Sequence, residues 1–234
     1  YVGENLSYEN EKIFAKPASE LTEYKGDPLS VICAVNENAG TRLETHGIRD
    51  EEFIRGNAPM TKEEVRTVSL SKLRLTADSV CYDVGAGTGS LSVEMALRAH
   101  QGQVWAIEKK EDAVELIHRN KLKFAADNLE IVEGLAPEAL KDLPTPTHAF
   151  IGGSSGNLKE IVKLLIEKNP QVRIVINCIT LETVSEALET AKEFGFEENE
   201  IVQLSAARSK AIGRYHMMMG ENPIYIITLQ NPGK

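Results

Sequence analysis

Short apolar runs alternate with amphipathic stretches along most of the chain from residue 79 onward. Apolar runs of about four to eight residues predict buried strands, and apolar residues at helical spacing predict the helices that cover them. Strands are expected at 79–84, 103–107, 129–132, 148–151 and 172–177. Helices are expected at 90–100, 111–126 and 181–194, and a further helix follows the loop at 152–156 and ends at residue 168. Two further strands, at 200–206 and 224–229, follow with no obvious helix between them.

This alternation predicts an α/β fold of the Rossmann-like type, a mostly parallel seven-stranded sheet with helices on both faces. Because the last two strands are joined without a helix, we expect an antiparallel strand pair at one edge of the sheet.

The first 42 residues have a different pattern. A short apolar run at 29–35 predicts one strand, and a turn cluster follows it from Asn36 to Gly40. One strand and one weak helix do not bury a core by themselves. We therefore divide the chain into residues 1–42 and 43–234, and expect the first part to be a packed arm or the remnant of another domain.

Composition and charge narrow the function classes. The chain has 234 residues, 42% hydrophobic and 26% charged, which is ordinary for a soluble globular protein. A net charge of −9 argues against non-specific nucleic-acid binding, and no apolar run is long enough to span a membrane. The three cysteines, Cys33, Cys81 and Cys178, have no paired spacing, so we expect no metal site, no disulfide framework and a cytoplasmic location.

A glycine-rich loop follows the first strand of the predicted sheet. It reads Asp-Val-Gly-Ala-Gly-Thr-Gly from Asp83 to Gly89, and glycines let a backbone approach a ligand closely. In open α/β sheets, ligands bind at the carboxyl ends of the strands. Ser90 stands where a dinucleotide fingerprint would have its third glycine, which counts against NAD.

Acidic and apolar residues at the next strand ends complete a cofactor pattern. Glu108 ends the second strand and can accept hydrogen bonds from both ribose hydroxyls. Asp83 can orient the loop or face a cationic ligand group. Leu135 and Ala136 follow the third strand, where they would cover an adenine. The whole pattern indicates an S-adenosylmethionine site, formed by Asp83, Gly85, Ala86, Gly87, Thr88, Gly89, Glu108, Leu135 and Ala136.

Four segments resemble one known family. They are Asn-Ala-Pro-Met-Thr-Lys-Glu-Glu-Val-Arg at 57–66, the loop at 83–89, Ile-Gly-Gly-Ser at 151–154, and Asn-Cys-Ile-Thr-Leu-Glu-Thr at 177–183. Residues from about 46 to 230 are similar to the decarboxylating precorrin methyltransferases of cobalamin biosynthesis. The resemblance implies methyl transfer from S-adenosylmethionine to carbon 15 of a precorrin-6-type tetrapyrrole, with loss of the ring C acetate carboxyl as carbon dioxide. It leaves open whether the substrate carries cobalt.

The resemblance also implies several finer points. Thr61 matches the segment that folds over the cofactor, so we expect a cofactor contact there. Leu135 stands where relatives often carry Asp, so we expect its contact to be a backbone one. The family suggests a homo-oligomer, a tetramer. Residues 1–35, with Val-Gly-Glu-Asn-Leu-Ser-Tyr at 2–8, resemble the end of the carbon-5 methylase, so the chain is similar to the C-terminal half of a fused precorrin-6Y carbon-5,15-methyltransferase.

A polycarboxylate acceptor would need cations and N–H donors in the protein. The segment 203–220 has no acidic residue, and the Gly-Ser loop at 152–156 leads into a helix N-terminus, a ready anion site. The predicted substrate-binding residues are Gly153, Ser154, Arg208, Lys210 and Arg214. The alternatives are a solvated hairpin for the basic segment and a helix-capping turn for the Gly-Ser loop. Decarboxylation requires a proton donor, for which His216 and Tyr215 are the candidates by chemistry.

Three other functions stay open on this sequence. The first is a methyltransferase acting on RNA or protein, although Ile-Gly-Gly at 151–153 replaces the Asp/Asn-Pro-Pro-Tyr motif of amine methyltransferases. The second is an NAD-dependent oxidoreductase. The third is a domain that binds S-adenosylmethionine or a tetrapyrrole without turnover.

Overall fold

A computed structural model describes residues 1–36, 46–196 and 198–231. The chain divides into two compact units, Tyr1–Leu43 and Glu44–Lys234. The predicted turn cluster at 36–40 lies outside the described residues except for Asn36. Within the described ranges, no helix combines the length and the apolar character that crossing a membrane would need.

The first unit contains a small antiparallel sheet. Its strands are β1 (Val2–Glu4), β2 (Lys12–Phe14) and β3 (Ser30–Ile32), with β1 in the centre. Only β3 falls in the apolar run that predicted a strand. Glu4 is buried and accepts hydrogen bonds from the Tyr24 hydroxyl (2.8 Å) and the Asp27 amide (3.0 Å).

The second unit contains the alternating strands and helices. In chain order they are α1 (Glu63–Leu73), β4 (Val80–Val84), α2 (Ser90–Arg98), β5 (Gln103–Glu108), α3 (Glu111–Lys123), β6 (Leu129–Glu133), β7 (His148–Ile151), α4 (Leu158–Lys168), β8 (Arg173–Cys178), α5 (Leu181–Glu193), β9 (Glu198–Leu204), β10 (Ala207–Ile212), β11 (Tyr215–Gly220) and β12 (Ile224–Gln230).

Seven strands of the described residues form one sheet, in the order β6-β5-β4-β7-β8-β12-β9. The first five are parallel to one another, and β12 is antiparallel to both β8 and β9. The predicted fold class is therefore confirmed, including the antiparallel pair at the edge. The reversed strand is β12. It lies one position in from the edge, between β8 and the edge strand β9.

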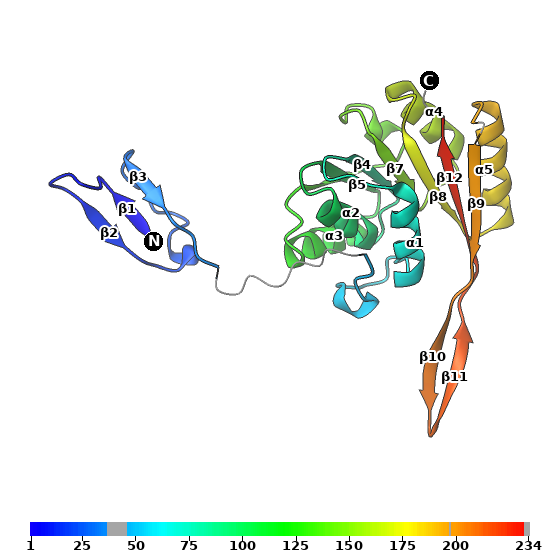
Figure 1. Ribbon diagram of the computed structural model, residues 1–234, viewed down its shortest axis with the longest axis horizontal. Coiled ribbons are helices and arrows are strands. Elements are labelled where there is room, and N and C mark those ends of the chain that lie inside the picture. Colours follow the sequence, from blue (N-terminus) through cyan, green and yellow to red (C-terminus); the bar gives the residue numbers. More distant parts are fainter. Residues whose placement is uncertain (37–45, 197, 232–234) are drawn as a thin grey trace. The chain divides into compact units, whose positions relative to one another are not determined.

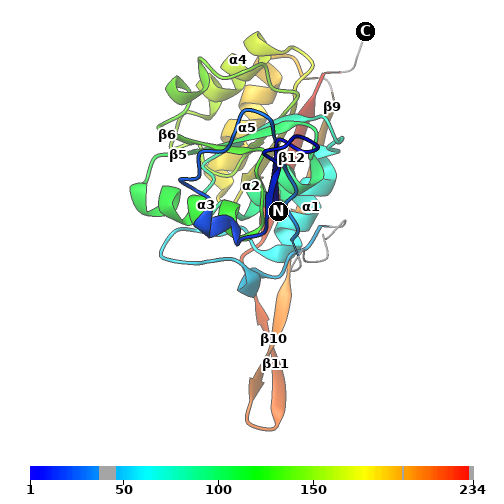
Figure 2. The same cartoon turned by 90° about the vertical axis from the view of Figure 1, so that its left-hand side faces the viewer.

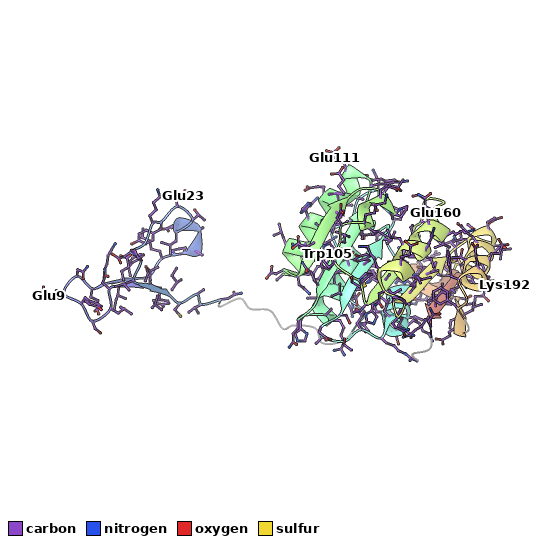
Figure 3. All side chains as sticks on the ribbon, turned by 90° about the horizontal axis from the view of Figure 1, so that it is seen from above. Glu9, Glu23, Trp105, Glu111, Glu160 and Lys192 are labelled. Atoms are coloured by element: carbon purple, nitrogen blue, oxygen red, sulfur yellow. The ribbon has the colours of Figure 1, made fainter. Side chains whose placement is uncertain are left out.

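Helices cover both faces of this sheet, and each face has its own apolar cluster (Figure 1). On one face, α1, α2 and α3 contribute Leu70, Leu91 and Ile117. On the other, α4 and α5 contribute Ile161 and Ala187. Seen from above, Trp105 lies inside the domain, whereas Glu111 and Glu160, on α3 and α4, lie at its surface (Figure 3). Burial of both sheet faces explains why the parallel strands are continuous apolar runs.

The strands β10 and β11 form a separate two-stranded hairpin. It projects from the end of β9 and β12, away from the helical layers (Figures 1 and 2). Arg208 pairs with Met219, Lys210 with Met217, and Ala211 with His216. The sequence pattern predicted a strand at 200–206 and left a solvated hairpin as the alternative for the basic segment 203–220, which is what the structure shows.

Candidate functional site

A cavity of about 700 Å³ opens at the carboxyl ends of the central strands. That volume is typical of a site for a cofactor-sized molecule. Its walls include 85–87 after β4, 107–110 at the end of β5, 134–136 after β6, 152–155 after β7, Asn177 and Ile179 at β8, the segment 59–62 before α1, and 221–222 with Ile224 at β12.

The glycine loop forms part of the cavity wall. Gly85 and Gly87 have φ values of +75° and +57°, which L residues with a side chain rarely adopt. A Cβ on Gly85 would lie 2.7 Å from the carbonyl oxygen of Gly153, and one on Gly87 would overlap the carbonyl oxygen of Pro59. Both positions therefore require glycine, because the loop packs directly against the backbone of Gly153 and Pro59.

Glu108 presents a fixed carboxylate at the end of β5. Its Oε2 accepts a hydrogen bond from the Gly87 amide at 2.9 Å. Its Oε1 accepts from the amides of Lys109 and Lys110, at 2.9 and 3.1 Å. A carboxylate offers about four acceptor positions, so capacity remains for a ligand hydroxyl. The side chain lines the cavity and is well placed to accept from a ribose.

Asp83 lies behind the glycine loop and does not line the cavity. Its Oδ2 accepts a hydrogen bond from the Ser92 hydroxyl, whereas its Oδ1 is buried without a partner in the described residues. Burial raises the pKa of Asp83 to about 7, and the negative charge of Glu108 adds to that shift. A cationic ligand in the cavity would favour the ionised form, which fits the sulfonium and ammonium groups of S-adenosylmethionine.

Thr88 and Gly89 are also behind the cavity wall. The Thr88 hydroxyl is buried without a partner in the described residues. Gly89 has φ +74° and immediately precedes α2, where an added Cβ would press on Ile117. Of the ten predicted cofactor-binding residues, seven line the cavity, namely Thr61, Gly85, Ala86, Gly87, Glu108, Leu135 and Ala136. The glycine cradle, the fixed acid and the orphaned Asp83 oxygen together fit the predicted cofactor.

The loop after β7 brings two predicted substrate-binding residues to the cavity. Gly153 and Ser154 line it, just before α4. Next to them, Ser155 has φ +54°, and its hydroxyl accepts a hydrogen bond from the Lys109 ammonium at 2.9 Å. That contact links the loop after β5 with the loop after β7 on either side of the glycine loop.

The five predicted site residues on the hairpin lie elsewhere. Arg208, Lys210, Arg214, Tyr215 and His216 are absent from the cavity wall, because β10 and β11 project away from the domain. Arg208 is engaged by carboxylates of its own chain. The other four side chains are exposed, and the Arg214 guanidinium lies 5.0 Å from the centre of the Tyr215 ring. None of these five residues lines the cavity of its own chain.

Several lining residues had no role in the sequence analysis. Lys62, Lys109 and Lys110 contribute positive charge, and no ion pair involves them within the described residues. Asn177, whose motif carried part of the resemblance, exchanges hydrogen bonds with the Ser69 hydroxyl. The signal for Lys62 was its place beside Thr61 in the segment 57–66. Within the described residues, no cluster of three His, Cys, Asp or Glu side chains could hold a metal ion.

Comparisons with known proteins agree with this geometry. The family described as the precorrin methyltransferase domain matches residues 52–231. A probable cobalt-precorrin-6B C(15)-methyltransferase (decarboxylating) of Pyrobaculum calidifontis is 45% identical over 187 residues, 79% of this chain and 95% of the relative. The cobalt-precorrin-6B C(15)-methyltransferase (decarboxylating) of Salmonella typhimurium is 37% identical over 185 residues, 78% of this chain and 95% of the relative.

A solved structure is similar over the same region. The crystal structure of precorrin-6y C5,15-methyltransferase from Geobacter metallireducens is 40% identical in sequence, with a TM-score of 0.75. The match covers 80% of this chain and 98% of that one.

Proposed function

Because the chain belongs to the precorrin methyltransferase domain family, we propose that it transfers a methyl group from S-adenosylmethionine to carbon 15 of cobalt-precorrin-6B and removes carbon dioxide from the ring C acetate. The reaction belongs to cobalamin biosynthesis. The observation that carries the proposal is the cavity in which Gly85, Gly87 and Glu108 meet, in a chain that aligns with nearly the whole length of its relatives.

The chain's residues would hold the cofactor at β4 and β5. Glu108 accepts from the ribose, the loop at 134–136 covers the adenine, and Thr61 closes the opposite side. Bound S-adenosylmethionine supplies an electrophilic methyl group. Asp83, behind the loop, stabilises positive charge in the cavity when it is ionised.

Methyl transfer to carbon then depends on orientation and on exclusion of water. The attacking atom is an electron-rich carbon of the macrocycle, so no protein nucleophile is required. Met60, Val65 and Ile179 give the cavity an apolar wall, and a dry cavity strengthens the electrostatic contacts inside it. Lys62, Gly153 and Ser154 would bind substrate carboxylates beside that wall.

Decarboxylation completes the proposed reaction. When the C–C bond to the carboxylate breaks, its electron pair enters the methylated, conjugated macrocycle. A proton then converts the remaining CH₂ group to methyl. Tyr215 and His216 stay the predicted donors by chemistry, and Lys210 and Arg214 stay predicted carboxylate ligands. Tyr215→Phe and His216→Asn test the two candidate donors. A variant that lacks the true donor would still methylate the substrate but would accumulate an undecarboxylated or unprotonated product.

Mass spectrometry of the tetrapyrrole tests the proposed function directly. Incubation with S-adenosylmethionine and cobalt-precorrin-6B should give a product that has gained one methyl group and lost carbon dioxide. Glu108→Ala should weaken cofactor binding about tenfold to a hundredfold, because a charged acceptor is lost. Glu115→Ala, on the exposed side of α3, is the matched control. Unchanged substrate mass with the cofactor still bound would leave a methyltransferase for another acceptor.

We also propose that the protein is a homo-oligomer, with a second copy of this chain on the hairpin. The support is the exposed apolar side chains of β10 and β11: Ile212, Met217, Met218 and Met219 stand open to solvent, with Met217 and Met219 on one face of the hairpin and Met218 on the other. Single surface apolar residues are normal, but several close together on one hairpin mark an interaction site. Light scattering should give a multiple of the chain mass, and Met218→Glu should reduce it. A wild-type monomer would contradict the proposal.

For the first unit, we propose that residues 1–42 are the end of a carbon-5 methylase domain. Ile13, Val31 and Ile32 are exposed on its small sheet, and Ile32 is 72% accessible, which a further packed layer would explain. The mass of the native polypeptide tests this. A natural chain of only 234 residues would contradict it.

The cytoplasm stays the predicted location.

A further inference from the structure

A buried arginine joins four parts of the second unit. Arg66, on α1, is completely buried. Its Nε donates to Glu94 Oε1 at 2.7 Å, and its Nη1 donates to Asp50 Oδ1 at 3.0 Å. The same Nη1 donates to the carbonyl oxygen of Thr61 at 2.5 Å, and Nη2 donates to the carbonyl of Ile48. Four hydrogen bonds from one guanidinium thus hold α2, the residues near Asp50 and the segment before α1.

A second arginine extends this network to the base of the hairpin. Asp50 accepts with its other oxygen, Oδ2, from Arg208 Nη1 at 2.9 Å. Arg208 also donates from Nε and Nη2 to the two oxygens of Glu64, at 3.0 and 2.5 Å. Its Nε lies 3.7 Å from Glu221 Oε1. Although burial opposes it, the two guanidinium groups hold the pKa of Asp50 below its ordinary value.

The network reaches the cavity at two places. Thr61, whose carbonyl Arg66 holds, lines it, and so does Glu221, which faces Arg208. The predicted cofactor residues lie at β4 and β5, whereas Glu221 lies just before β12, on the far side of β7 and β8 in the strand order. One connected set of charges therefore contacts a wall on the side of the predicted cofactor residues and a wall at the opposite end of the cavity.

We propose that Arg66 and Arg208, bridged by Asp50, are positioning residues of this site. Arg66 sets the wall that closes on the cofactor, and Arg208 sets the wall at Glu221 that bounds the acceptor. The inference rests on the proposed function for the identity of the two ligands. It gives Arg208 a different role from the substrate contact that the sequence predicted, since the guanidinium is already engaged by three carboxylates.

Arg208→Gln is the first test, because Arg208 lies on the hairpin and its side chain is one-third exposed. The three readouts are the dissociation constant of S-adenosylmethionine by calorimetry, the acceptor KM with kcat, and the urea midpoint. We expect the acceptor KM to rise about tenfold, with the cofactor dissociation constant unchanged. Arg208→Lys should recover part of the loss. Lys192→Gln, on the outer side of α5, is the charge-matched control (Figure 3).

Glu64→Gln separates positioning from direct substrate binding by Arg208. Glu64 does not line the cavity. If Arg208 bound substrate carboxylates directly, removing its competing partner would lower the acceptor KM or leave it unchanged. If Arg208 acts by position, the KM must rise as it does in Arg208→Gln. A lowered or unchanged KM in Glu64→Gln therefore overturns the assignment.

Asp50→Asn tests the bridge and keeps the side-chain shape. We expect it to raise both the cofactor dissociation constant and the acceptor KM, because both guanidinium groups lose the same partner. Loss of urea resistance with both constants unchanged would reduce the network to a purely structural one and overturn the proposal. If the wild type binds cofactor but turns over no cobalt-precorrin, the proposed function fails. The dissociation constant of S-adenosylmethionine in Asp50→Asn then still decides the role of Arg66.

Discussion

Gly87 is the residue at which the glycine loop meets the segment before α1. Its φ of +57° and the overlap of any Cβ with the Pro59 carbonyl act together against a side chain. We expect Gly87→Ala to weaken S-adenosylmethionine binding at least about tenfold, because the two cavity walls must separate. Calorimetric titration measures this.

The control for Gly87→Ala is Gly195→Ala. Gly195 also has a left-handed φ, +70°, but nothing lies within 4 Å of its added Cβ. Both variants should lose about 1 kcal/mol of stability from the backbone strain. Only Gly87→Ala should lose cofactor affinity, and equal affinities in the two variants would contradict the clash argument.

Asp83 makes stability depend on pH. Its folded pKa is raised from 3.8 to about 7, so between these values the folded state binds more protons than the unfolded chain. Stability contributed by the neutral form is therefore present at low pH and is lost as pH rises through about 7. Urea unfolding at pH 5 and pH 8 should show a larger fall for the wild type than for Asp83→Asn.

The exposed Asp142→Asn serves as the control and should keep the wild-type pH dependence. Because ionised Asp83 favours a cation in the cavity, cofactor affinity should rise over the same pH range and lose that dependence in Asp83→Asn. A variant that followed the wild type in both measurements would show that the carboxyl is already ionised at low pH.

Predicted site residues that are local in sequence lie together in the structure, and their cofactor role stays a prediction. Gly85, Gly87 and Glu108 follow two neighbouring strands, so a pattern of strand ends was enough to bring them together. Arg208 and Asp50 are 158 positions apart, and no local pattern pairs them. The acid-free segment around Arg208 suggested a free cation, but two of its acidic partners, Asp50 and Glu64, come from the other end of the domain.

At the scale of elements, α3 shows how one helix divides between core and solvent. Leu116 is buried, close to Gly56, and Leu122 is 80% exposed. We expect Leu116→Ala to lower the free energy of unfolding by about 2–5 kcal/mol, since it removes buried surface and leaves a cavity. Leu122→Ala on the same helix should change it by less than about 0.5 kcal/mol. Urea denaturation compares them, and similar losses would contradict the described burial.

The helix α1 was missed and the hairpin was predicted only as an alternative, for opposite physical reasons. In α1 the buried side includes Arg66 and Ser69 beside Val65, Leu70 and Leu73, so no clean apolar stripe marks the helix. Burial of the arginine is possible only because distant carboxylates neutralise it. The hairpin buries neither face of β10 and β11, so its sequence lacks the alternation of apolar and polar residues that predicts a strand.

At the scale of the whole molecule, the second unit contains everything that the proposed chemistry uses. Every residue that lines the cavity lies between Pro59 and Ile224. The relatives from Pyrobaculum calidifontis and Salmonella typhimurium are covered over 95% of their lengths by alignments of 187 and 185 residues. Chains of about this size are thus a sufficient unit for the family, without a counterpart of the first unit.

A chain beginning at residue 44 should bind S-adenosylmethionine with the affinity of the full chain, because it loses no lining residue. It should also keep the urea midpoint, since in the first unit Val2 is the buried apolar residue among those described and contributes little to any core. Calorimetry and urea denaturation of the two chains measure this. A truncated chain that aggregates or binds cofactor more than about tenfold more weakly would show that the first unit supports the site.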